Sequence, residues 1–339
     1  MQERSMIQEN VNFEASGVQF GSLRVPHSVN RSAYGHIAIP IAVIKNGDGP
    51  TVLLTGGVHG DEYEGPVALS KLVRRINVAD VSGRIIVIPA LNYPAFLAAT
   101  RVSPIDGINL NRTFPGKRDG TVTEMIAHYV TSRLLPISDY LFDFHAGGSS
   151  LQYLPGVLAP FAHQERDPER AAQLLNAFAP KRIYYYDSDS ALSGEDRVLG
   201  NYAKKADVAF LCGEFGGGSS VNLEGLQTVE QGLLGYLREV GVLRSELVSN
   251  GETCGAQSFS LDGQGLMAFS PKTGFFEPAF QLGETIQPGG MAGAIYDLDN
   301  PWEDPVIVNF ERGGVAVCIR TYSMVQPGDC LGHLAIPIS

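Results

Sequence analysis

The 339-residue sequence has no Cys-x-x-Cys pair and only four cysteines, Cys212, Cys254, Cys318 and Cys330. Without closely spaced thiols, neither a disulfide framework nor a thiolate zinc site is indicated. The sequence also lacks a run of about 18 apolar residues, and its N-terminus lacks the basic start and apolar stretch of a signal peptide. We therefore expect a cytoplasmic protein with reduced thiols and no membrane contact.

Basic residues are scarce, because 25 Lys and Arg stand against 36 Asp and Glu, for a formal charge of −11. This balance argues against nucleic acid or an anionic membrane as a partner, and it mildly favours substrates that carry a positive group. With 44% hydrophobic and 18% charged residues, the composition is that of an ordinary folded enzyme and not of a disordered or fibrous chain. Whether the chain forms a homo-oligomer is left open.

The first two thirds of the sequence alternate between β-rich runs and segments with helical periodicity. This alternation predicts an α/β domain with a mainly parallel sheet that helices cover on both faces. The turn at 46–50 predicts a hairpin or tight connection between the first two strands. Strands are expected at 37–46, 51–56, 85–88, 140–144, 183–186 and 208–212, and helices at 65–77, 121–135, 195–206 and 224–240.

After about residue 249 the sequence changes to short β runs separated by Gly and Pro, which predicts a C-terminal all-β module. We therefore expect two domains, residues 1–248 and 249–339. The pattern looks like a biotinyl- or lipoyl-type barrel, with similar turns at 282–289 and 325–329. The hairpin that would present a carrier lysine reads Glu311-Arg312-Gly313-Gly314, so we do not expect it to carry a cofactor.

The strongest functional signal is the segment TGGVHGDEYEG, residues 55–65, between a predicted strand and a predicted helix. His59 and Glu62 are three residues apart, and imidazole and carboxylate are suitable zinc ligands. His145 ends another predicted strand, in YLFDFHAGG, and supplies a third ligand. Asp143 lies on the same side of that strand and is suited to orienting the site. The sequence predicts one zinc ion per chain, held by His59, Glu62 and His145.

Three further features complete the candidate site. Arg101 is suited to polarising a carbonyl, although a surface salt bridge is an equal alternative. Asn111 and Arg112 offer an amide and a fork of donors for a substrate carboxylate. Glu214 follows an apolar strand, in the motif GEFGGG. Partial burial there raises the proton affinity of the carboxyl group, which suits a general base that activates water and later returns the proton.

The ordered motifs HGDE, NLNRTFPG, DFHAGG and GEFGGG resemble the succinylglutamate desuccinylase and aspartoacylase family. The resemblance covers most of residues 20–240. It implies a zinc-carboxypeptidase-like fold, zinc on His59, Glu62 and His145, and Glu214 as the base. It also implies that Asn111 and Arg112 hold the substrate carboxylate and that Arg101 polarises the scissile carbonyl.

Within the family, NLNRTFPG and PKTGFFEP are most similar to deacetylases of ectoine breakdown that act on Nα-acetyl-L-2,4-diaminobutyrate. No clear match exists for the further arginine with which aspartoacylases bind an acidic side chain. The nearby basic residues that do not align are Arg197, Lys204 and Lys205. The candidates for binding a cationic side chain are Asp187, Asp189, Glu195 and Asp196.

Four other functions are alternatives to this deacetylase hypothesis. Two are other enzymes of similar chemistry, namely an aspartoacylase or desuccinylase and a carboxypeptidase acting on small peptides. A non-catalytic binding protein on the same scaffold would be expected to have lost Glu214 or a metal ligand. A hydride-transfer enzyme is disfavoured because GGVHG lacks the Gly-x-Gly-x-x-Gly spacing.

Overall fold

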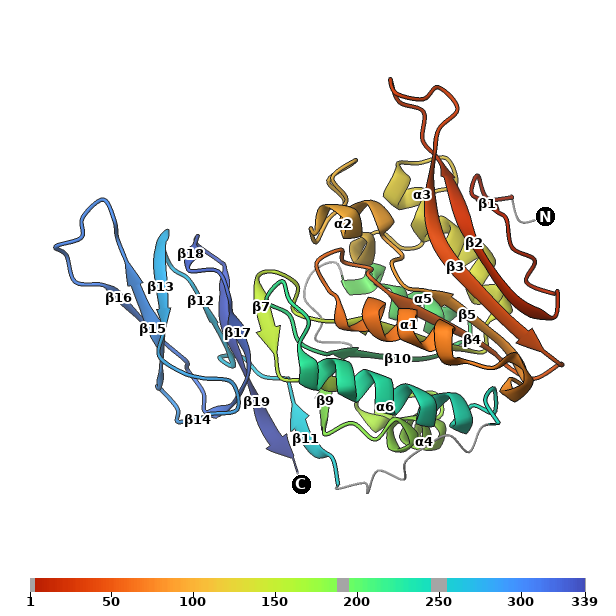
Figure 1. Cartoon of the computed structure of the whole chain (residues 1–339). Coiled ribbons are helices and arrows are strands. Elements are labelled where there is room, and N and C mark those ends of the chain that lie inside the picture. Colours follow the sequence, from red (N-terminus) through yellow and green to blue (C-terminus); the bar gives the residue numbers. More distant parts are fainter. Residues whose placement is uncertain (1–3, 188–194, 245–254, 339) are drawn as a thin grey trace.

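The computed structural model describes residues 4–187, 195–244 and 255–338, and one large sheet runs through much of this part of the chain (Figure 1). Its strands are, in spatial order, β1 (Gln8–Glu9), β2 (Gly17–Pro26), β3 (His36–Asn46), β5 (Gly83–Ile88), β4 (Thr51–Gly56), β6 (Tyr140–His145), β10 (Ala209–Glu214), β8 (Gly156–Pro160), β9 (Arg182–Tyr186), β11 (Gln257–Ser260), β19 (Cys330–Ile338), β17 (Gly314–Arg320) and β14 (Thr285–Ile286). Two short strands lie off this path, β12 (Met267–Phe269) beside β19 and β7 (Leu151–Tyr153) beside β17.

The sheet is mixed, and the expectation of a mainly parallel sheet holds only for its centre. Parallel pairs join β5, β4, β6 and β10 in turn, and further along they join β8, β9 and β11. The strands before β5 and after β11 pair antiparallel. β8 and β10, between the two parallel groups, also pair antiparallel. Antiparallel pairing needs only a short turn, as between β2 and β3, whereas parallel neighbours need a crossover.

Residues 37–46 and 51–56 are joined by a tight connection, which is one of the two predicted alternatives, but the hairpin alternative is wrong. The two segments form β3 and β4, but β5 lies between them, antiparallel to β3 and parallel to β4. Every residue of β4 and β5 is buried. Continuous burial of this kind favours a central position with neighbours on both edges, and the short turn at 46–50 does not overcome it.

Helices cover both faces of the sheet. On one face α1 (Glu64–Arg75), α4 (Pro168–Phe178) and α6 (Leu223–Glu239) share a core with Val52 and Leu54 of β4. On the other, α3 (Val122–Tyr129) and α5 (Leu199–Lys205) share a core with Leu53, because successive strand residues point to opposite faces. The short helix α2 (Tyr93–Ala98) follows β5.

The helix predicted at 121–135 begins as expected but changes form after Tyr129. Thr121 and Glu124 form a reciprocal capping box at its start. A wider π turn, Val130–Leu134, and a 3-10 turn, Leu135–Ile137, then complete the segment. Pro136 lies in that last turn, and its missing N–H prevents regular helical pairing there.

The C-terminal part is all β, as predicted. Besides the strands that continue the main sheet, it forms a second sheet of four strands, β16 (Val306–Asn309), β15 (Met291–Tyr296), β13 (Gly274–Pro278) and β18 (Met324–Val325). An apolar cluster that includes Phe276, Phe310 and Leu331 fills this part. The predicted domain boundary at 248/249 lies outside the described residues.

The described thiols are unpaired, since Cys212, Cys318 and Cys330 are free, whereas Cys254 lies outside the described residues. Burial raises the pKa of all three described thiols. Among the described residues, none of the helices has both the length and the apolar character that crossing a membrane requires.

Candidate metal centre

Two neighbouring parallel strands carry the predicted metal ligands. His59 and Glu62 lie in the connection between β4 and α1, and His145 is the last residue of β6. β4 and β6 are hydrogen-bonded in parallel, so their carboxyl ends meet at one edge of the sheet. Gly60 lets the first loop pass directly over α2, because a Cβ there would lie 2.0 Å from the carbonyl carbon of Ala95.

The three side chains converge on one buried point. The Glu62 carboxylate lies between the two imidazoles, with Oε1 2.7 Å from Nδ1 of His59 and Oε2 2.9 Å from Nδ1 of His145. One ligand atom from each residue falls within 4.8 Å of the others. All three side chains are buried, so a cation held here is shielded from bulk water on the protein side.

The charge states of Glu62 and His59 suit a cation, whereas the raised pKa of His145 means that a metal binding there must displace a proton. Burial alone would raise the pKa of Glu62, but the charges of His59 and His145 and their hydrogen bonds hold it below its usual value, so the carboxylate is ionised. Burial lowers the pKa of His59, which favours the neutral imidazole that a metal requires. Burial also acts to lower the pKa of His145, but Asp143 and Glu62 outweigh it and raise this pKa.

A second layer of acceptors orients both imidazoles. Nε2 of His145 lies 2.8 Å from Oδ2 of Asp143, whose Oδ1 accepts a 2.7 Å hydrogen bond from the Thr55 hydroxyl. Nε2 of His59 lies 3.1 Å from Oδ1 of Asn109. When each imidazole donates its Nε2 proton to this acceptor, its Nδ1 lone pair faces the cluster and is available to a metal. The donor set, its burial and its orientation fit zinc.

The sequence did not predict a role for Asn109, although it singled out Asn111 and Arg112 in the same turn. Its Oδ1 also accepts from the backbone N–H of Asn111, in the turn that begins the Leu110–Arg112 3-10 segment. One side chain therefore links a predicted metal ligand to the predicted substrate-binding turn. The sequence signal that could have found it was its place as the first residue of the NLNRTFPG motif.

Replacing Asp143 tests this outer layer. Asp143→Ala is expected to lower zinc affinity about 10- to 100-fold, because an outer carboxylate orients the imidazole and raises its basicity. Competition with a chromophoric chelator measures the affinity. Asp119→Ala, at an exposed acidic position, is the matched control and should bind zinc like the wild type. Wild-type affinity in Asp143→Ala would show that Asp143 does not support the metal.

Glu214, the predicted base, ends β10 and pairs in register with His145 on the adjacent strand. Its Oε2 atom is buried and has no hydrogen-bond partner within the described part of the chain. Burial, followed by the negative charge of Glu62, raises the pKa of Glu214 to about 7. A carboxyl group with this pKa, placed beside the cluster, can both accept and return a proton near neutral pH.

The loop after Glu214 folds back against the loop after His145. Gly217 has a φ of +126°, and a Cβ there would lie 2.2 Å from the carbonyl oxygen of Leu151. The backbone N–H of Tyr153 donates to the Gly216 carbonyl, and that of Gly218 donates to the Leu151 carbonyl. The glycines of GEFGGG therefore permit close contact between the two loops that frame the cluster.

Arg101 reaches the cluster from a loop. Its Nη1 atom lies 3.6 Å from Oε1 of Glu62 and 3.5 Å from Nδ1 of His59. The side chain is 46% exposed, so the guanidinium lies between the buried ligands and solvent. A substrate carbonyl that enters from solvent would meet a donor at this position.

Asn111 and Arg112 lie on the turn that Asn109 begins. Oδ1 of Asn111 accepts a 2.9 Å hydrogen bond from the backbone N–H of Leu199, which ties this turn to the start of α5. Nη1 of Arg112 donates to the Asn111 carbonyl at 2.7 Å. The Asn111 oxygen therefore has a structural role, and the side-chain donors of this turn are what suit a carboxylate.

The nearby basic residues that could not be aligned are engaged elsewhere. Arg197 lies 3.3 Å from the Thr113 carbonyl through Nη2, Lys204 pairs with Glu165 at 3.8 Å, and Lys205 lies 4.3 Å above the Tyr202 ring. Among the acidic candidates, Asp187 accepts a hydrogen bond from Gln164 and Asp196 is exposed. Asp189 and the side chain of Glu195 lie outside the described residues.

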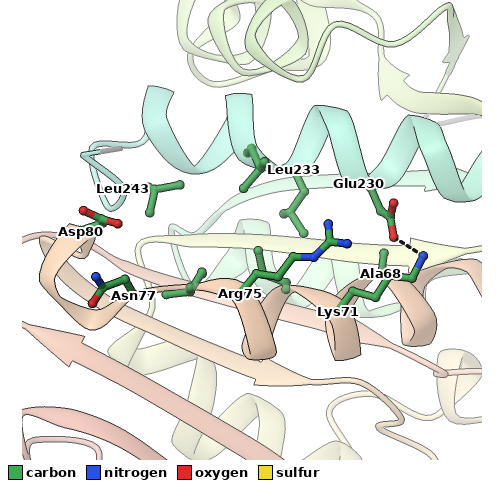
Figure 2. A pocket seen from close by; sticks show the side chains of 11 residues that line it. Ala68, Lys71, Arg75, Asn77, Asp80, Glu230, Leu233 and Leu243 are labelled. Carbon is green, nitrogen blue, oxygen red and sulfur yellow. Dashed lines mark ion pairs between the residues drawn. The ribbon is translucent and has the colours of Figure 1, made fainter. Parts of the chain in front are cut away.

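A separate cavity of about 230 Å³ lies between α1 and α6 (Figure 2). It is lined mainly by aliphatic side chains, including Leu72 and Leu233, and Lys71 pairs with Glu230 at 2.6 Å on its wall. None of the predicted site residues lines it. We therefore assign it no part in the chemistry at the cluster.

Comparisons with known proteins agree with this geometry. The succinylglutamate desuccinylase/aspartoacylase catalytic domain model matches residues 48–240. The N-alpha-acetyl-L-2,4-diaminobutyric acid deacetylase of Halomonas elongata is 38% identical over 337 residues, which cover 98% of this chain and 96% of that protein.

Two solved structures are similar over nearly the whole chain. The product-bound ectoine utilization protein EutE of Ruegeria pomeroyi is 35% identical with a TM-score of 0.92, covering 98% of this chain and all of that one. A succinylglutamate desuccinylase of Silicibacter is 33% identical with a TM-score of 0.91, covering 99% of this chain and all of that one. The likeness therefore extends beyond the catalytic part into the C-terminal strands.

Proposed function

Because this chain belongs to the succinylglutamate desuccinylase/aspartoacylase family, we propose that it is a zinc-dependent deacetylase that hydrolyses Nα-acetyl-L-2,4-diaminobutyrate to acetate and L-2,4-diaminobutyrate. The observation that carries the proposal is the buried cluster of His59, Glu62 and His145, with Glu214 at the adjacent strand end. The near full-length similarity to a deacetylase of that substrate supports the choice of acyl group and amino acid.

We propose that His59 and His145, through Nδ1, and Glu62, through its carboxylate, hold one zinc ion per chain. Bound there, zinc supplies a Lewis acid for the acetyl carbonyl and makes water more acidic. Asp143 and Asn109 keep the two imidazoles in the orientation that this binding requires.

The remaining residues have separate roles in the reaction. Glu214 takes a proton from the attacking water as its oxygen bonds to the acetyl carbon, and it delivers that proton to the amide nitrogen as the C–N bond breaks. Arg101 donates to the acetyl oxygen as negative charge develops there. Asn111 and Arg112 bind the α-carboxylate, which keeps the acetyl group at the cluster.

We also propose the division into residues 1–248 and 249–339. The separate apolar cluster around Phe276, Phe310 and Leu331 supports it. Two similar turns support a lipoyl- or biotinyl-like module, since the N–H of Gly290 bonds to Gln287 and that of Asp329 bonds to Gln326. The predicted hairpin at 311–314 is instead the connection between β16 and β17, which lie in different sheets. Since this segment reads Glu311-Arg312-Gly313-Gly314 without a lysine, we propose that the module does not act as a cofactor carrier.

Substrate preference tests the proposal directly. The value of kcat/KM for Nα-acetyl-L-2,4-diaminobutyrate should exceed that for N-acetylaspartate by roughly 100-fold or more, since leaving a buried charge unpaired costs about 3–5 kcal/mol. The physical reason is that Arg197, Lys204 and Lys205 already have partners, so a second substrate carboxylate finds no cation among them. Equal or reversed preference contradicts the diaminobutyrate assignment and leaves the deacylase chemistry intact.

The same assay separates the other candidate activities. Nα-succinylglutamate tests a desuccinylase, and a dipeptide with a free amino terminus tests a carboxypeptidase. Each compound is compared at equal concentration with the zinc-loaded protein. Faster release of succinate or of a C-terminal amino acid than of acetate would replace the proposed activity.

A further inference from the structure

Charge is segregated between two distant parts of the sequence. Residues 15–47 contain Arg24, Arg31 and Lys45 but no Asp or Glu. Residues 273–311 contain seven Asp and Glu but no Lys, Arg or His. In a chain whose overall charge is −11, the first segment is a local exception, and the two are electrostatically complementary.

The acidic segment builds an uncovered apolar face on the four-stranded sheet. Phe275 pairs with Tyr296 on one side and Met324 on the other, so these three side chains share a face. Tyr296 is 41% exposed and Met324 is 53% exposed, whereas the adjacent Phe276 points into the core. Ile307, on the edge strand β16, is also half exposed.

The loop between β15 and β16, which follows Tyr296 directly, carries further exposed apolar side chains. Trp302 is 79% exposed and Leu298 is 64% exposed, and Asp299, Glu303 and Asp304 lie beside them in the sequence. We call the set Phe275, Tyr296, Leu298, Trp302, Ile307 and Met324 the C-terminal face. Exposed aromatic and aliphatic side chains with acidic neighbours are typical of a protein interaction site.

The basic segment forms a long hairpin. β2 and β3 pair from Gly17 with Lys45 to Pro26 with His36, and reciprocal hydrogen bonds between Val29 and Ser32 close the turn beyond them. Arg31 lies within this turn, and the nearby Tyr34 is 98% exposed. Figure 1 shows the tip of the hairpin projecting at the top of the molecule, away from the C-terminal sheet at the far left.

We propose that the C-terminal face binds the β2–β3 hairpin tip of a second copy of this chain. Arg31 at the tip is opposite in charge to Asp299, Glu303 and Asp304 beside Trp302, whereas Lys45, at the other end of the hairpin, pairs with Glu14. Tyrosine and arginine, both present at the tip, are residue types that dominate interface energies. Arg31 also suits the electron-rich face of the Trp302 indole. Because each copy offers both surfaces, a two-fold pair makes the contact twice and closes as a dimer.

The single tryptophan of the chain makes the contact directly measurable. Sedimentation velocity and Trp302 emission are recorded on the zinc-loaded protein over about a 100-fold range of concentration, at low and high salt. We expect a monomer–dimer equilibrium, an emission maximum that moves to shorter wavelength with the dimer fraction, and weaker association at high salt. A monomer throughout, or a dimer with unchanged emission, overturns the proposal.

Variants at the tip give the matched test. The double variant Tyr34→Ala, Arg31→Glu should weaken dimerisation at least 10-fold while turnover of the monomer stays at the wild-type level. Arg74→Glu, an equal charge reversal at an exposed position on α1, is the control and should dimerise normally. Glu303→Arg added to Arg31→Glu should restore association. A dimer that persists in the double variant assigns the interface to another surface and refutes the proposal.

Discussion

Glu214→Gln is expected to lower kcat about 100- to 10,000-fold, the range that general acid–base catalysis usually contributes. The substitution is nearly isosteric, so zinc content and KM should stay close to the wild-type values. An amide cannot take the proton from the attacking water, and the buried Glu214 carboxyl, whose pKa is raised to about 7, is suited to that task. Steady-state kinetics with metal analysis of the same preparations measures the effect.

The control for this variant is Glu224→Gln, at a carboxylate on the first turn of α6 that pairs with Lys181 and Arg182. It changes one charge on the same part of the chain and should leave kcat unchanged. Near-normal turnover in Glu214→Gln would remove Glu214 from the chemistry. Loss of zinc in that variant would instead mean that it supports the metal.

His145→Ala is expected to lose stoichiometric zinc and deacetylase activity together. The substitution removes one of three ligands and leaves the carboxylates of Asp143 and Glu62 facing each other across an empty space. A buried carboxylate without its partner costs about 3–5 kcal/mol, so the variant should also be less stable. Metal analysis after gel filtration, with activity and thermal unfolding on the same sample, measures all three.

Two further variants keep this test decisive if His145→Ala does not fold. His145→Asn keeps a hydrogen-bonding group at this position and leaves a smaller space than alanine does. It should also lose zinc. His128→Gln, on α3 outside the cluster, is the histidine control and should keep both zinc and activity. Stoichiometric zinc at wild-type affinity in His145→Asn would exclude His145 as a ligand.

Local sequence patterns predicted the elements that carry the site more accurately than their arrangement. The strands that end near His59, His145 and Glu214 were predicted to within two residues of their observed limits, because buried β runs followed by glycine are strong local signals. The placement of β5 between β3 and β4 was not predicted. Strand order depends on which apolar faces are covered, and neighbouring residues do not encode that directly.

The contact of Asn109 with His59 shows the same limit at the level of one side chain. The two residues are 50 positions apart, and the hydrogen bond exists only because the loop after α2 returns over the end of β4. Asp143 was easier to predict as a partner of His145, since residues two apart in a strand share a face.

The sequence by itself determined the chemical groups available to this protein, namely two imidazoles, paired carboxylates and guanidinium donors at the ends of predicted elements. It also determined the charge segregation between residues 15–47 and 273–311. Tertiary structure alone decided which nitrogen of His59 and of His145 faces Glu62, and that Oε2 of Glu214 is buried at the adjacent strand end. The reason is physical: residue type fixes what a group can donate or accept, whereas its orientation and pKa depend on partners that the fold brings from distant parts of the chain.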